Sequence, residues 1–224
     1  MRPFVCLSVL SFATTILFSA CSSPPDPPAD GGVPIGGCRL PYVGDPKAPM
    51  EVEVVAIDPD YKFMSITEGS DISLMNPPQE GRVLFVGVRA RNVNPCGVRL
   101  SGALRDPISQ QVRLDSRIIN LQVTDDGYGQ SDVTDIFTFA NIPACPNQWS
   151  DQDLMDVPYT LIVSLTDGDD RKVTRELQVT PRCNEPGQIE GCRCKCDADY
   201  VLGMMCSAVD GGLSDGSIED AAGD

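Results

Sequence analysis

Cysteine is the residue type with the clearest chemistry in this sequence. Ten cysteines occur among the 224 residues, and eight of them lie beyond the first 21 residues. These eight are Cys38, Cys96, Cys145, Cys183, Cys192, Cys194, Cys196 and Cys206. An even number of cysteines in an exported chain predicts disulfide bonds, and we expect all eight to be oxidised. The alternative is a metal site in the sequence CRCKC at residues 192–196, but paired zinc ligands are normally separated by two or more residues. We therefore predict no bound metal.

Histidine is absent from the sequence. Its absence removes the usual general base, the Ser–His and Cys–His nucleophile pairs, and the most common zinc ligand. Paired carboxylates of the kind used by glycosidases are not marked out by any motif. We predict that the protein is not an enzyme and has no cofactor. The alternative is an enzyme that uses Asp and Glu side chains.

Aspartate-rich turns form the other candidate site. They occur at residues 58–60, 125–126 and 167–170, and calcium requires about six to eight oxygen ligands. None of these turns matches an EF-hand loop, and aspartate is common in turns because it caps and bends the chain. A calcium-dependent carbohydrate-binding module is therefore the alternative to the metal-free binding module that we predict.

The charge balance narrows the range of partners. Lys and Arg number 17 and Asp and Glu 32, which gives a net charge of −15. A chain this acidic repels nucleic acids and anionic head groups, and no basic patch with interleaved aromatic residues offsets the repulsion. We predict that nucleic acid is not a partner and that the charge serves solubility.

The first 20 residues have the features of a secretory signal. Arg2 is the only charged residue before a run of apolar or small residues from Phe4 to Ala20, and such a segment is removed rather than folded. The sequence FSAC that ends at Cys21 resembles the lipobox of bacterial lipoproteins, with Phe18 in place of the usual Leu.

The lipobox resemblance implies a lipid anchor. The chain would be cut before Cys21, whose thiol and freed amine would be acylated, and two or three acyl chains hold a protein on a bilayer. Ser22 follows instead of Asp, which by analogy with lipoprotein sorting in bacteria with two membranes implies the outer membrane. The alternative is an ordinary signal peptide, with Cys21 as a structural cysteine.

Composition divides the chain into five parts. After the signal peptide at 1–20, residues 21–46 hold the lipidated cysteine and a tether rich in Pro and Gly. Residues 47–182 alternate between apolar and polar side chains, as strands do. Residues 183–206 are rich in cysteine, and residues 207–224 form an acidic tail with few large apolar side chains, which predicts disorder.

Strand-like alternation dominates the region 47–182. It is clearest at 98–105, 159–165 and 173–180, and further strands are expected at 50–57, 83–88, 112–123 and 133–139. About seven strands predict an all-β fold, an antiparallel β-sandwich. Their order resembles immunoglobulin-like and fibronectin III-like domains, and Tyr159 resembles the tyrosine corner of that fold. A closed barrel is the structural alternative.

The disulfide pairing is predicted in two ways. Cys96 and Cys145 each follow a predicted strand, so we expect both in loops of the sandwich and joined as Cys96–Cys145. The sequence from Cys194 to Cys206 resembles the closing half of an EGF-like module. That resemblance implies Cys196–Cys206 and Cys183–Cys194, and it leaves Cys38–Cys192 to clamp the start of the domain to a small, disulfide-stapled C-terminal segment.

Trp149 is the candidate for contact with a partner. It is the only tryptophan and lies in the loop sequence PNQWSDQ; an exposed Trp is often an interface hot spot, although Trp is more often buried, here as a lid over one end of the sandwich. These observations predict a non-catalytic lipoprotein at the cell surface or in the periplasm, acting as a binding or structural module. Its partners would be the bilayer, through acylated Cys21, and an unidentified protein or glycan.

Overall fold

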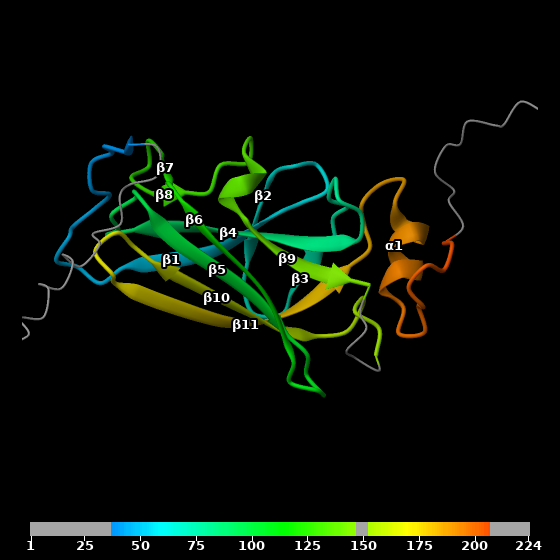
Figure 1. The fold of residues 1–224 in the computed structure, drawn as a ribbon. Helices are drawn as coiled ribbons and strands as arrows, with labels where there is room; N and C mark the ends of the chain where they lie inside the picture. Colours follow the sequence, from blue (N-terminus) through cyan, green and yellow to red (C-terminus); the bar gives the residue numbers. More distant parts are fainter. Residues whose placement is uncertain (1–36, 147–151, 207–224) are drawn as a thin grey trace, which may run out of the picture. The chain divides into compact units, whose positions relative to one another are not determined.

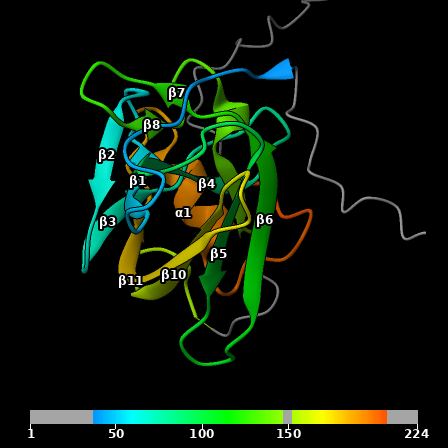
Figure 2. The same ribbon diagram turned by 90° about the vertical axis from the view of Figure 1, so that its left-hand side faces the viewer.

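The computed structural model describes residues 37–146 and 152–206 and shows an all-β sandwich (Figure 1). The first sheet has the order β2 (Phe63–Ile66), β1 (Glu51–Ile57), β4 (Arg82–Arg91), β8 (Gly129–Gln130) and β7 (Gln122–Val123), and β9 (Ala140–Cys145) also pairs with β4. The second sheet has the order β3 (Ser70–Ser73), β11 (Lys172–Arg182), β10 (Tyr159–Thr166), β5 (Val98–Arg105) and β6 (Val112–Ile119). Figure 2 shows β2 and β3 at one side of the sandwich and β6 at the other. The predicted fold class is confirmed.

The core lies between the sheets, where alternate side chains of each strand meet. In β10 every second residue is buried, beginning with Tyr159, and β4 is buried on both faces along most of its length, as expected for a central strand. The hydroxyl of Tyr159 donates a hydrogen bond of 3.2 Å to the carbonyl of Asp153. This bond back to the preceding segment is the arrangement expected of a tyrosine corner.

One predicted strand is wrong. Residues 133–139 do not form a strand; they contain the short 3₁₀ helix η2 (Ile136–Thr138), and β9 follows it. The cause is Asp135, whose carboxylate accepts a hydrogen bond of 3.0 Å from the backbone N–H of Phe137 and caps the helix. The short strands β2 and β3 were not predicted.

The strand β6 has an inverted pattern of exposure. Val112, Leu114 and Ile118 point outward and are about half exposed. The alternate residues Arg113 and Asp115 point inward and contact β9: Arg113 donates to the carbonyl of Ala144, and Asp115 accepts 2.7 Å from the N–H of Asn141. Polar side chains therefore close this side of the sandwich by binding the free backbone edge of β9.

The eight cysteines form four disulfides, which confirms that all are oxidised. The bonds are Cys38–Cys96, Cys145–Cys196, Cys183–Cys192 and Cys194–Cys206. All four predicted pairings, Cys96–Cys145, Cys196–Cys206, Cys183–Cys194 and Cys38–Cys192, are wrong.

Distance explains the failure of the Cys96–Cys145 pairing. Cys145 lies opposite Arg82, the first residue of β4, whereas Cys96 follows Arg91, the last residue of that strand. The ten residues of β4 separate the two ends by about 30 Å, and a disulfide requires Cα atoms within about 7 Å. In Figure 1 the first described residues and α1 likewise lie at opposite ends of the sandwich, which rules out Cys38–Cys192.

Helical geometry explains the other two failures. Residues 189–196 form the helix α1 (Ile189–Cys196), which was not predicted. In a helix, residues four apart share a face, so Cys192 and Cys196 both point into the protein and are buried. Cys194 points the other way and reaches Cys206. Among the described residues, no helix is long and apolar enough to cross a bilayer.

Candidate binding groove

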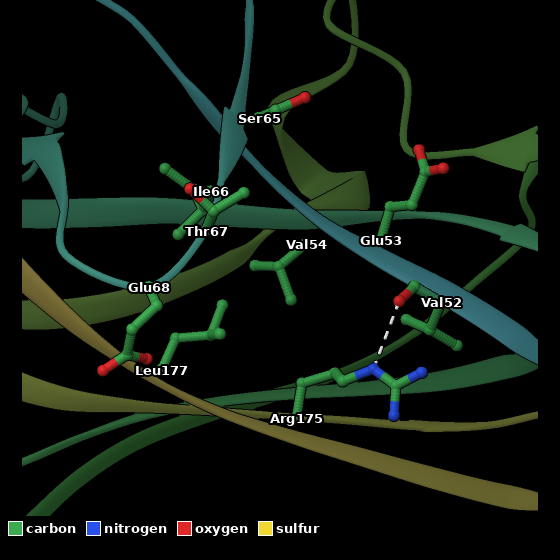
Figure 3. Close-up of a pocket in the computed structure, with 9 residues that line it drawn as sticks. All are labelled: Val52, Glu53, Val54, Ser65, Ile66, Thr67, Glu68, Arg175 and Leu177. Atoms are coloured by element: carbon green, nitrogen blue, oxygen red, sulfur yellow. Dashed lines mark hydrogen bonds between the residues drawn. The ribbon is translucent and has the colours of Figure 1, made fainter.

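A groove of about 480 Å³ opens at the side of the sandwich where β1 and β2 face β11 (Figure 3). It exists because the flanking strands are short. The strand β2 pairs with β1 only from Val54 to Ile57, and β3 pairs with β11 only from Val179 to Arg182. Among the described residues, the preceding parts of β1 and β11 therefore have no paired strand on this side.

The walls of the groove are apolar and its rim is polar. Val52, Val54 and Ile66 are buried, and Leu177 is half-buried against the same core. The remaining lining residues are Glu53, Ser65, Thr67, Glu68 and Arg175. The volume lies within the range of about 300 to 1,000 Å³ found for ligand sites, which commonly combine apolar walls with a few polar groups.

Both glutamates at the rim already have partners. Glu53 accepts a hydrogen bond of 2.9 Å from Arg89, and this bond is the main reason that the pKa of Arg89 is raised. Glu68 accepts 3.1 Å from the backbone N–H of Gln178. Both carboxylates are therefore already engaged in hydrogen bonds that stabilise the fold beside the groove.

Unlike the two glutamates, the third charged residue of the groove, Arg175, extends across it. Its Nε donates a hydrogen bond of 3.3 Å to the carbonyl oxygen of Val52, across the groove (Figure 3). Within residues 37–146 and 152–206 its guanidinium has no ion pair, as is also true of Arg39, Arg91 and Arg99, whereas seven other arginines have one. Those seven are Arg82, Arg89, Arg105, Arg117, Arg171, Arg182 and Arg193.

The location of Arg175 gives it a chemical role. It lies on the face of β11 that also carries Val173, Leu177 and Val179, and its side chain is solvent-exposed at the mouth of the groove. A guanidinium carries five N–H donors in a planar fork that matches a carboxylate or phosphate. The groove therefore offers apolar contact to one part of a ligand and a charge-assisted hydrogen bond to an anionic part.

Sequence reasoning missed Arg175, although a signal was present. The predicted strand at 173–180 has an apolar face formed by Val173, Leu177 and Val179. Arg175 is the one charged residue at the positions of that face. A charge on the inward face of a strand indicates either protection of an edge or a site, and only the structure shows that a groove lies in front of it.

None of the predicted site residues that the structure describes lines the groove. Cys21 and Trp149 lie outside the described residues. The carboxylate of Asp58 accepts hydrogen bonds from the backbone of Asp60 and Lys62, and that of Asp167 accepts from the backbone of the hairpin turn that it begins. In the part of the chain that the structure describes, no group of three carboxylates brings its oxygen atoms within 4.8 Å of one another.

The closest group of potential metal ligands is a set of sulfur atoms beside α1. Those of Cys183, Cys192 and Cys196 all lie within 4.8 Å of one another. Each belongs to a disulfide, Cys183–Cys192 or Cys145–Cys196, and a disulfide sulfur is not the thiolate that a metal requires. The group therefore forms two adjacent buried crosslinks that fasten α1 to the sandwich.

The chain matches no model of a protein family, no curated protein and no solved structure.

Proposed function

We propose that this chain is a non-catalytic binding module, held by lipid on Cys21 outside the cytoplasm, whose ligand enters the groove between β1 and β11. The ligand has an apolar part that fits between the sheets and an anionic group that pairs with Arg175. The observation that carries the proposal is the guanidinium of Arg175, which has no ion pair among the described residues and lies across a groove with apolar walls, in a chain with almost twice as many acidic as basic residues.

Electrostatics supports this assignment. In a protein of net charge −15, a cation near so many carboxylates is readily paired, and most arginines of the described chain are. Among the described residues, the guanidinium of Arg175 instead bonds a neutral carbonyl, at 3.3 Å. A carboxylate carries a full negative charge and can accept two parallel N–H bonds from a guanidinium, so an anionic ligand competes well with the carbonyl of Val52.

The disulfides support export. Four disulfides link all eight cysteines beyond Cys21, and such bonds persist in oxidising compartments outside the cytoplasm. An immunoglobulin-like architecture suits the proposal, because it supplies a rigid frame on which edges and loops bind ligands.

The groove can be tested with small probes. Residues 22–224 would be labelled with ¹⁵N, since the described chain falls within one compact unit at 32–224, and titrated with hexanoate or with hexylamine. Hexanoate should shift the backbone resonances of Val52, Ile66 and Leu177 saturably in the millimolar range. Hexylamine, which has the same chain and the opposite charge, should not. Equal shifts with both probes, or shifts confined to other strands, would show that the groove does not select anions.

The anchor can be tested separately. The full-length protein should fractionate with membranes and partition into detergent after cleavage, and the Cys21→Ser variant should remain as precursor or become soluble. A cleaved Cys21→Ser protein that still partitions into detergent would contradict lipidation at Cys21.

A further inference from the structure

Two strand edges border the groove, and in the part of the chain that the structure describes both have backbone groups without a partner strand. The strand β11 is covered by β3 only from Val179 onward, and β1 is covered by β2 only from Val54 onward. An uncovered edge presents N–H and C=O groups that can pair with another strand. The groove is therefore bounded by hydrogen-bonding backbone as well as by apolar side chains.

Gln178 shows which groups of β11 face the groove side. Its N–H donates 3.1 Å to Glu68 and its C=O accepts 2.8 Å from the N–H of Gly69, so both groups point away from β10. Backbone direction alternates along a strand. The N–H and C=O groups of Glu176 and Thr174 therefore also point away from β10, and among the described residues neither has a hydrogen-bond partner on that side.

We propose that the ligand is an extended segment of another polypeptide, which adds to β11 as a strand alongside Thr174–Glu176. This inference rests on the proposed binding function of the groove and names its ligand class. The added strand would exchange backbone hydrogen bonds with Thr174 and Glu176, the mode by which many domains bind peptides at a free sheet edge.

The side chains of β11 set the sequence that such a strand should have. Residues directly opposite each other on two paired strands share a face and interact. A residue opposite Arg175 should therefore be Asp or Glu, and the residues two positions away on either side should be apolar because they lie opposite Val173 and Leu177. The preferred segment has the pattern apolar-x-acidic-x-apolar.

The unliganded edge is protected by the same residue. Arg175 points inward and bonds Val52 across the groove, and an inward-pointing charge is one way in which proteins prevent strands from associating at an edge. A strand with an acidic residue at the matching position replaces this bond to a neutral carbonyl with an ion pair, and a strand without an acidic residue offers the guanidinium no opposite charge. Arg175 thus selects among strands instead of blocking all of them.

The test uses a designed peptide and the free edge as the reporter. The probe is acetyl-Val-Thr-Asp-Thr-Val-Thr-amide, which ends opposite Leu177 because Glu68 and Gly69 already occupy the edge at Gln178; it is added to ¹⁵N-labelled residues 22–224, and amide hydrogen exchange is measured residue by residue. Saturating peptide should slow exchange at Thr174 and Glu176 at least tenfold. The amide of Arg175, which points toward β10, should change little. Replacing the Asp of the peptide by Lys should weaken binding at least tenfold.

Methylated peptides provide the matched control. In an antiparallel pair centred on Arg175, the two Thr residues beside the Asp donate to β11, whereas both Val residues point their N–H groups away. N-methylation of those two Thr residues should abolish the protection, and N-methylation of the two Val residues should preserve it. Equal loss of protection with both would overturn strand addition.

The outcomes separate this inference from the proposed function. If hexanoate binds in the groove but the peptide never protects Thr174 and Glu176, the groove binds anions and strand addition is wrong. If neither probe binds, both proposals are wrong, and Arg175 serves only to protect the edge. Protection at β6 instead of β11 would also overturn the inference.

Discussion

Removal of the Cys145–Cys196 disulfide should destabilise the sandwich by about 4 kcal/mol. The bond joins β9 to the last residue of α1 and closes a loop with a sequence separation of 51 that contains both β10 and β11. Crosslinking restricts the unfolded chain, and for a loop of this length the restriction is worth about 4 kcal/mol at 25 °C. The test variant is Cys145→Ala combined with Cys196→Ala.

The Cys194–Cys206 disulfide provides the control. It closes a loop with a sequence separation of 12, and both ends of that loop lie beyond the last strand of the sandwich. Its removal, by Cys194→Ala combined with Cys206→Ala, should loosen the C-terminal segment and change the stability of the sandwich by less than about 0.5 kcal/mol.

Urea unfolding followed by circular dichroism measures both variants. With a slope of about 2 kcal/mol per molar urea, the Cys145/Cys196 variant should unfold at a urea concentration about 2 M lower than the native protein. The control should unfold within about 0.3 M of it. A decrease in the urea midpoint of less than about 0.5 M for the first variant would contradict the argument from loop length. An equal decrease for both variants would show that the C-terminal segment unfolds together with the sandwich.

Three further predictions concern packing, exposure and charge. Gly102→Ala should cost about 1–3 kcal/mol in urea unfolding, because its new Cβ would lie 2.9 Å from side chains of β9; an unchanged midpoint would contradict that packing. Leu114→Thr should change stability by less than about 0.5 kcal/mol, since the side chain is 57% exposed on β6, and a larger loss would place this side chain in the core. The Thr124 hydroxyl and then Arg89 lower the pKa of Asp126 below its ordinary 3.8, so this carboxylate stabilises the fold above that pH and ceases to do so as pH falls through the lowered pKa. Asp126→Asn should flatten the decline of melting temperature in this acid range, and an unaltered decline would exclude a role for Asp126.

Long strands with strict alternation were predictable from the sequence. In β10, Tyr159, Leu161, Val163 and Leu165 are buried and alternate with partly exposed residues, because one face of a sandwich sheet meets the core and the other meets solvent. The central strand β4 was also recognisable, since it is apolar at both alternations and buried on both faces. The local sequence pattern is therefore enough to predict a strand wherever alternate residues of that strand point into the core and into solvent.

Short or tertiary features were not predictable. The four-residue strands β2 and β3 carry too few side chains to show a period. On β6 the tertiary contacts of Arg113 and Asp115 with β9 reverse the usual relation between polarity and exposure. The disulfide pairing depended on whether residues 189–196 were helical, because helical phase decides which cysteine faces the protein.

The groove is a consequence of strand length, which the sequence does not display. It exists because β2 and β3 end before they cover β1 and β11 fully. Arg175 could be recognised as a charge on an apolar face, but the carbonyl of Val52 that it bonds comes from a strand more than a hundred residues earlier. Only the arrangement of the two sheets brings these groups together.

Whether Arg175 binds an anionic ligand in the groove can be tested by measuring the dissociation constant of hexanoate for three forms of the protein. Native residues 22–224, the Arg175→Gln variant and the Arg99→Gln variant would be titrated by ¹⁵N NMR under identical conditions. Arg99 lies on the outer face of β5, so its variant loses the same charge away from the groove. We expect Arg175→Gln to raise the dissociation constant at least tenfold, which corresponds to about 1.4 kcal/mol. We expect Arg99→Gln to leave the dissociation constant within twofold of the native value. Equal dissociation constants for the native protein and Arg175→Gln would contradict binding of the anion by Arg175.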